Sequence, residues 1–224
     1  MAITFDNSFS WSLGGGPNTT SYTVTGTDPY VFVAVASQNR TGQTIGTIKY
    51  NGVDLTQLIT RNDSLSGNVE LWGLVGPASG SHNMVITWTA QADIAAGCIA
   101  SYAGVHQTTP LGTAVSNNST TAGPGLGSAA GLVIGVDEWG VVAIEASGVT
   151  FTAGAGDNDR VQNANKPRLG IVDSTAVSVT YTASASVAWA AVGVPLKPSG
   201  AAAAAAAGHG ALLLGQRNRV LQHV

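Results

Sequence analysis

The chain has few charged residues, and this shortage limits what its surface can bind. Charged side chains make up 9 % of its 224 residues, with nine bases and twelve acids for a formal net charge of −3. No run of bases is present before the last segment, so a groove that follows a nucleic-acid backbone is excluded there. Hydroxyl and amide side chains must therefore form most of the solvated surface, and we expect no nucleic-acid partner.

Cysteine is nearly absent as well. The only one, Cys98, lies in the apolar stretch from Ile94 to Ala100, where a buried, unreactive thiol is expected. A chain of this length buries enough surface to be stable without a disulfide or a metal. We accordingly expect neither a metal site nor a cofactor.

Targeting signals are also missing from the sequence. The first residues, MAITFDNSFSW, have no basic start and reach Asp6 before any apolar run could form, so no secretory signal is predicted and synthesis in a cytoplasm is expected. The longest run of low polarity, from Ala201 to Leu214, is shorter than the ~20 residues of a membrane span. We expect no membrane partner.

Short strand patterns dominate the chain up to Pro198. They recur between Gly- and Asn-rich turns at the spacing of an all-β, antiparallel β-sandwich. The stretch Tyr30 to Ala36 is apolar on both faces and predicts a central strand. The pair Asn51-Gly52 predicts a tight hairpin between Thr47–Tyr50 and Val53–Ile59. In the stretch from Met84 to Thr89, the alternate residues Met84, Ile86 and Trp88 are expected to face the core.

A possible internal repeat follows from two similar blocks. Thr87-Trp88-Thr89-Ala90 matches Thr180-Tyr181-Thr182-Ala183, and Tyr30–Val35 matches Gly131–Val136 in pattern. Either the sequence is duplicated, or two hairpins rich in Val, Thr and Ala merely look alike. The segments 117–131 and 153–160 are interpreted as surface loops.

The last segment differs in composition from everything before it. We divide the chain into a β-sandwich domain, residues 1–198, and an Ala-rich C-terminal arm, residues 199–224, expected to be helical or extended. On a helical wheel Arg217 falls within an apolar stripe, and Arg219 lies on the opposite side. Such a helix needs a surface to bury its stripe, either on a partner or on its own domain, and disorder is the other alternative. The predicted partner-binding residues are Leu212, Leu213, Leu214, Arg217, Arg219, Val220, Leu221 and Val224.

Three kinds of chemistry were weighed against structural roles. Asp137, Glu138 and Glu145 are the only cluster that could supply two carboxylates for glycoside hydrolysis. For the adjacent acids Asp137 and Glu138 a solvated rim is the favoured interpretation, and we predict no enzymatic activity. Asp157 and Asp159 could ligate calcium, but an Asx-rich turn explains them without an ion and is the favoured interpretation.

Aromatic residues raise the third possibility, which is sugar binding. Trp72, Trp88 and Trp189 lie in apolar strand patterns and are expected in the core, whereas Trp11 and Trp139 are the candidates for stacking on sugar rings. Packing in the core or at its rim is favoured for both.

Four stretches together resemble a β-sandwich module of tailed-phage virion proteins. They are YNGVDLTQL, VELWGLVGPASGSHNMVITW, IASYAGVHQTTPLG and VAWAAVGVPLKP, and the resemblance extends from about Tyr22 to Pro198. It implies a jelly-roll-like domain displayed on a capsid or tail, and it carries over no catalytic residues.

The functional hypothesis combines this resemblance with the arm. We expect a structural virion protein, most concretely a capsid decoration (cement) protein that binds the major capsid protein or another virion protein through its arm. A homo-oligomer such as a trimer is expected by analogy. The alternative is a carbohydrate-binding or adhesive module of a tail fibre or cell surface.

Overall fold

The structure is a computed structural model that describes residues 1–14, 17–37, 44–62, 67–90, 94–119, 132–164, 167–176, 178–185 and 187–200. These residues form an all-β fold in which every strand pairing is antiparallel, as the sequence predicts. The first strands are β1 (Thr4–Leu13), β2 (Asn18–Val24), β3 (Tyr30–Ser37), β4 (Thr44–Tyr50), β5 (Val53–Asp54), β6 (Thr56–Asn62), β7 (Asn68–Val75), β8 (Gly80–Ala90) and β9 (Ala95–Ala103). The remaining strands are β10 (Val115–Ser119), β11 (Trp139–Ala146), β12 (Phe151–Ala153), β13 (Asn158–Asn163), β14 (Arg168–Ser174), β15 (Tyr181–Ala183) and β16 (Trp189–Leu196).

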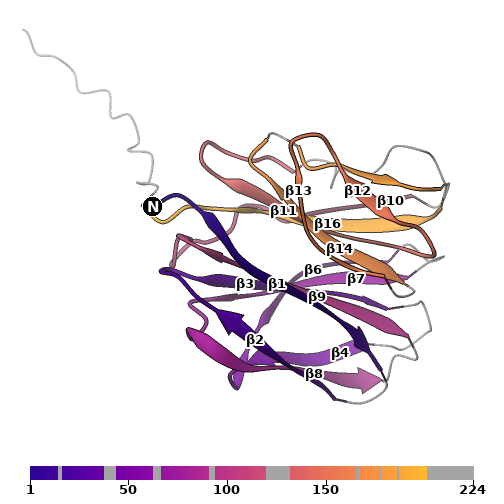
Figure 1. The fold of residues 1–224 in the computed structure, drawn as a ribbon, viewed down its shortest axis with the longest axis horizontal. Helices are drawn as coiled ribbons and strands as arrows, with labels where there is room; N and C mark the ends of the chain where they lie inside the picture. The colour runs from indigo at the N-terminus through magenta and orange to yellow at the C-terminus, as the bar shows by residue number, and fades with distance from the viewer. Residues whose placement is uncertain are drawn as a thin grey trace, which may run out of the picture.

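The sheets are stacked in layers (Figure 1). The middle sheet has the order β1-β9-β3-β7-β6, and the sheet β2-β8-β4-β5 lies on one of its faces. On its other face lies the sheet β10-β16-β11-β14-β13, whose far side is covered by the pair β12-β15. The chain therefore builds more layers than the two of a simple sandwich.

Each interface between layers has its own hydrophobic core. Alternate residues of β3 supply two of them: Phe32 and Ala34 face the sheet that contains β11, whereas Val31 and Val33 face the sheet that contains β8. This is why Tyr30 to Ala36 is apolar on both faces, and the expectation of a central strand is confirmed. The third core lies between β11, β14 and the pair β12-β15, around Ile144, Val172 and Tyr181.

The strand order of the second half repeats that of the first. β10-β16-β11-β14-β13 corresponds position by position to β1-β9-β3-β7-β6, and β12-β15 corresponds to β4-β8. We call β1–β9 the first repeat and β10–β16 the second. The match of Thr87–Ala90 to Thr180–Ala183 falls on the corresponding strands β8 and β15, which favours duplication over chance similarity.

The other predicted match, of Tyr30–Val35 with Gly131–Val136, is wrong. The counterpart of β3 is β11, which begins at Trp139, whereas the described residues 132–138 form no strand. Two segments interpreted as loops also contain strands, because β10 extends to Ser119 and β13 begins at Asn158. In both places pairing with a neighbouring strand overrides a polar composition that is typical of loops.

The hairpin at Asn51-Gly52 is confirmed. Both residues have positive φ, 49° and 79°, as a tight two-residue turn requires. The predicted strand Val53–Ile59 is divided, however, because the chain passes from one sheet to the next at Leu55. The buried side chain of Leu55 and the bond from its N–H to the Ile48 carbonyl, at 2.8 Å, fix this crossing.

Most of the predicted core residues are confirmed. Met84 and Ile86 are fully buried on one face of β8, and Trp88 is partly buried against the same core. Trp72 and Trp189 are buried as well. Cys98 is also buried, and burial raises the pKa of its thiol, which keeps it protonated and unreactive.

The edge strand β1 is closed by side chains from both neighbouring sheets. The Tyr22 hydroxyl donates to the Asn7 carbonyl and the Asn163 amide donates to the Trp11 carbonyl, each at 2.7 Å. A bulge between Phe5 and Asn7 further breaks the regular edge. These contacts occupy backbone groups that would otherwise accept another strand.

Close packing in the first core depends on Gly73 of β7. A Cβ atom at Gly73 would lie 2.8 Å from Cζ of Tyr30, a core residue that is 2 % exposed. Gly14 gives a contrast, because a Cβ there would meet no atom within 4 Å.

We predict that Gly73→Ala lowers the free energy of unfolding by about 1–3 kcal/mol, because the buried Tyr30 ring must move to admit the methyl group. Urea denaturation of the purified protein measures this, with Gly14→Ala as the matched control. Equal stabilities of the two variants would show that the Tyr30 contact is not tight.

Candidate functional site

All predicted partner-binding residues of the arm lie outside the described residues. They are Leu212, Leu213, Leu214, Arg217, Arg219, Val220, Leu221 and Val224. Their role stays a prediction. What the structure describes is the place where the arm begins, at Ser199 and Gly200.

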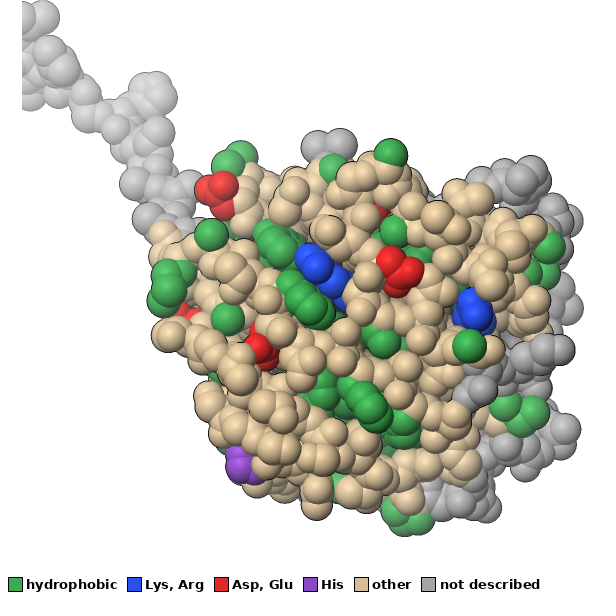
Figure 2. Space-filling view, viewed as in Figure 1, with side chains coloured by type: hydrophobic (Ala, Val, Ile, Leu, Met, Phe, Trp, Pro, Cys, Tyr) green, Lys and Arg blue, Asp and Glu red, His purple; other side chains and the backbone are tan. Residues whose placement is uncertain are grey.

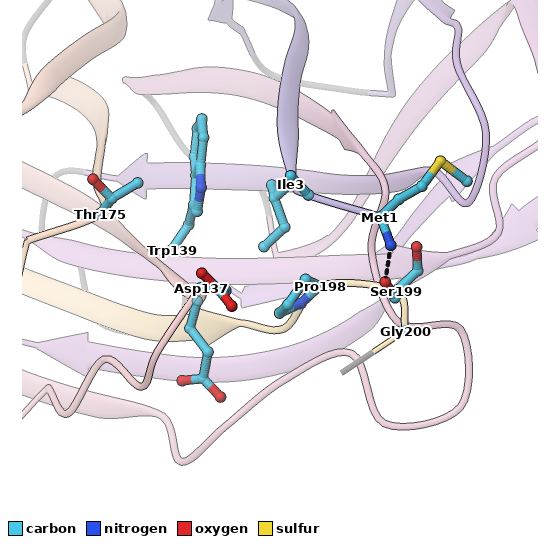
Figure 3. A pocket seen from close by; sticks show the side chains of 10 residues that line it. Met1, Ile3, Asp137, Trp139, Thr175, Pro198, Ser199 and Gly200 are labelled. Atoms are coloured by element: carbon cyan, nitrogen blue, oxygen red, sulfur yellow. Dashed lines mark hydrogen bonds between the residues drawn. The ribbon is translucent and has the colours of Figure 1, made fainter. Parts of the chain in front are cut away.

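A pocket of about 600 Å³ lies at this place. It is formed by four parts of the chain that are far apart in the sequence, namely residues 1–3, residues 137–139, Thr175 and residues 198–200. In Figure 3, Trp139 and Ile3 lie above Asp137 and Pro198. The Met1 ammonium donates a hydrogen bond to the Ser199 carbonyl. The pocket is thus walled by apolar side chains and carries carboxylates.

A tight turn before β11 presents one of these carboxylates. The Glu138 N–H donates to the Gly135 carbonyl, and the Glu138 side chain accepts the Gly135 N–H at 2.9 Å, so Glu138 is held by the turn itself. Asp137 sits in the turn with a positive φ of 62°. Among the described residues, no hydrogen-bond or ion-pair partner is found for the exposed Asp137 carboxylate.

Exposed apolar side chains surround the pocket. Val136, next to Asp137, is 90 % exposed, and Met1 is 66 % exposed. Figure 2 shows hydrophobic side chains beside acidic ones at the end of the molecule where the described chain stops. The combination of an apolar rim with carboxylates suits a ligand that is both apolar and cationic.

Trp139 forms one wall of the pocket, and its ring contacts the side chains of Tyr102 and Arg160. The Tyr102 ring meets it edge to face, with ring centroids 5.9 Å apart. The Arg160 guanidinium lies 5.5 Å from its centroid and 4.3 Å from that of Phe5. Trp139 is therefore half-buried, as rim packing predicts, and one part of it remains available to the pocket.

Arg160 belongs to a buried network between the two repeats. Its Nε donates to Asp173 Oδ2 at 2.6 Å, and Asp173 is completely buried. The same oxygen accepts the Tyr102 hydroxyl at 2.8 Å, and the other accepts the Asn158 amide at 3.2 Å. Burial, reinforced by the Asp173 charge, holds the pKa of Tyr102 well above its usual range, so Tyr102 remains a donor.

Trp11, the second sugar candidate, lies elsewhere on the molecule. Its ring lies across Gly97 on the paired strand and stacks on Phe9, with centroids 6.2 Å apart. It is half-buried against the core around Val33 and Ile86. Trp11 and Trp139 are thus not brought together into one binding surface.

The three acids considered for hydrolysis do not converge. Asp137 and Glu138 line the pocket, but Glu145 follows seven residues later in extended β11, roughly 20 Å away. The Glu145 side chain is also fully buried and lies against Gly67, so it does not face the pocket. Carboxylate pairs of glycosidases are only about 5 to 10 Å apart.

The acids considered for calcium point to different partners. Asp157 Oδ2 accepts the backbone N–H of Thr180 at 2.8 Å, and Asp159 accepts the Gln162 amide. Burial raises the pKa of Asp159, although the Gln162 bond opposes this. Within the described residues no group of three or more potential metal ligands is found. The Asp157 carboxylate thus joins its loop to Thr180, 23 residues further along the chain, rather than forming the expected Asx turn.

Comparisons with protein-family models, curated proteins and solved structures found no match to this chain. In the part of the chain that is described, no helix is long and apolar enough to cross a membrane. Sequence reasoning found Asp137, Glu138 and Trp139 but not the rest of the pocket. No sequence pattern marks Ile3 or Pro198 as a pocket residue, because only the packing of distant segments brings them together.

We predict that Arg160→Met lowers the free energy of unfolding by about 3 kcal/mol, because it leaves the buried Asp173 carboxylate without its cation. Urea denaturation gives the value, and the double variant Arg160→Met/Asp173→Asn is expected to recover part of it. A double variant no more stable than Arg160→Met would contradict the charge explanation.

Proposed function

We propose that the protein is a structural component of a tailed-phage virion, most concretely a capsid decoration protein that holds to the particle through its C-terminal arm. The observation that carries this proposal is the relation between the two parts of the chain. A stacked β scaffold ends at Gly200, beside a pocket with an exposed apolar rim, and a segment of different composition follows. This arrangement suits a displayed domain with an attachment arm.

We further propose that each repeat is jelly-roll-like. In the first repeat, β1-β9-β3-β7 faces β2-β8-β4-β5, and the chain passes from one sheet to the other at every connection except β4 to β5 and β6 to β7. This order supports a pair of interleaved Greek keys, which is how a jelly roll is built. The second repeat has the same order in its larger sheet, with two strands described opposite it.

The hydrogen bonds of the buried polar side chains support a structural role. Asp173 joins the repeats through Arg160 and Tyr102. Glu70 accepts hydrogen bonds from Trp72 and Gln57 at 3.0 and 2.8 Å. These side chains stabilise the packing of strands rather than facing a common ligand.

Charge gives the arm a preferred kind of partner. The arm carries Arg217 and Arg219 and no acid, so its formal charge is +2 and that of the remainder is −5. An acidic surface on the major capsid protein or another virion protein is therefore the expected attachment site.

We predict that deleting residues 201–224 abolishes retention of the protein on purified phage particles, because the contact surface is removed while the β domain remains. Co-sedimentation of the protein with particles measures this. Arg217→Ala is expected to weaken retention about tenfold and Arg219→Ala much less, because only Arg217 falls within the apolar stripe. Undiminished retention after deletion would reject anchoring by the arm.

A carbohydrate-binding or adhesive role is the second candidate, and one observation favours it. Trp139 lines an open pocket beside Asp137 and Glu138, and an aromatic face with nearby hydrogen-bond acceptors suits a sugar ring. On a glycan array this role predicts specific binding that is lost in Trp139→Ala and retained in Trp11→Ala. Absence of binding by the unaltered protein would reject it.

A further inference from the structure

The chemistry of the pocket at the start of the arm favours a guanidinium group. The Asp137 carboxylate has no partner among the described residues, and the turn holds it beside Trp139 and Pro198 (Figure 3). A planar cation can pair with a carboxylate through two hydrogen bonds and stack on an aromatic ring at the same time. No lysine or arginine lines the pocket, and the Met1 ammonium, the cation that does line it, is hydrogen-bonded to the Ser199 carbonyl.

The arm contains a residue that matches this requirement. Arg217 follows Leu213 and Leu214 by four and three residues, which is the spacing at which side chains share one face if a segment is helical. An arginine inside an apolar stripe loses solvation when the stripe is buried, so it needs a carboxylate at the contact. Exposed Val136 and Met1 beside the pocket offer the apolar surface that the leucines require.

The length of the arm also fits. Seven alanines, 201–207, separate Gly200 from the glycine-containing triplet 208–210, and Arg217 is seven residues beyond Gly210. Glycines allow the sharp reversal of a chain. A segment that reverses at this triplet therefore returns Arg217 to the level of Gly200, which itself lines the pocket.

We propose that this pocket is a binding site for the guanidinium group of Arg217, carried by the C-terminal arm of the same chain. The tether makes the contact intramolecular, which gives it an effective concentration in the millimolar range. In the free protein the apolar stripe of the arm is thereby covered, and an acidic partner surface competes with Asp137 for the same arginine. The proposal concerns the isolated chain and does not depend on attachment to a virion.

The test uses the full chain with a spin label at position 216. Gln216→Cys provides the labelling site, because the native Cys98 is fully buried; treatment of the unaltered protein with the same reagent checks that Cys98 does not react. The measurement is the paramagnetic broadening of the backbone amide signals of Val136 to Trp139 in a ¹⁵N-labelled sample. Docking of the arm is expected to broaden these signals and to leave sharp those of the Asn51-Gly52 hairpin, whose sheet lies on the other face of the middle sheet from β11.

Matched variants distinguish the proposed contact between Asp137 and Arg217 from nonspecific electrostatic attraction between the arm and the domain. Asp137→Asn removes the charge while keeping the turn, because asparagine tolerates the positive φ of this position. Asp137→Asn and Arg217→Gln are each expected to reduce the docked-to-free ratio roughly tenfold. Glu138→Gln and Arg219→Gln are the controls and should have much smaller effects, since Glu138 is engaged by Gly135.

Two results would overturn the proposal. One is the absence of broadening near Asp137, or broadening that the Asp137→Asn and Arg217→Gln variants leave unchanged. The other is broadening that arises between chains, detected by mixing ¹⁵N-labelled protein without a spin label with unlabelled protein that carries it. Because no particle is present, these outcomes are independent of the retention experiment on virions.

Discussion

The middle sheet must be covered on both faces, and the rest of the fold follows from this constraint. The neighbouring strands β3 and β9 bury almost every side chain, so neither face of that sheet can meet water without exposing a large apolar area. One face is covered by the other sheet of the first repeat, which contains β8. The other face is covered by the larger sheet of the second repeat, which makes the two repeats one stacked body.

The boundary between the repeats is specified by polar contacts at its margin. An apolar interface of valines and alanines fixes few details of register, whereas Asp173 must meet Arg160, Tyr102 and Asn158 at once. Arg160 in turn lies between the rings of Phe5 and Trp139. The network that aligns the repeats therefore also sets the position of the pocket wall.

Sequence patterns predicted those features that depend on neighbouring residues. Alternation placed Met84 and Ile86 in the core, and the positive φ required by a tight turn identified Asn51-Gly52. Features that depend on distant pairing were missed. Nothing in the sequence around Glu145 indicates that its side chain is buried against Gly67 of the other repeat. The pocket was missed for the same reason, since Ile3, Trp139 and Pro198 meet only after both repeats have packed.

The closed edge of β1 has a consequence for crowded surroundings. Copies of a protein with only 9 % charged residues repel one another weakly, so electrostatics does little to prevent strand edges from joining. Tyr22 and Asn163 occupy the carbonyl groups of Asn7 and Trp11, which removes two of the hydrogen-bond acceptors that β1 could offer to a neighbouring β-strand. Joining of copies through the β1 edge is therefore opposed even at high local density.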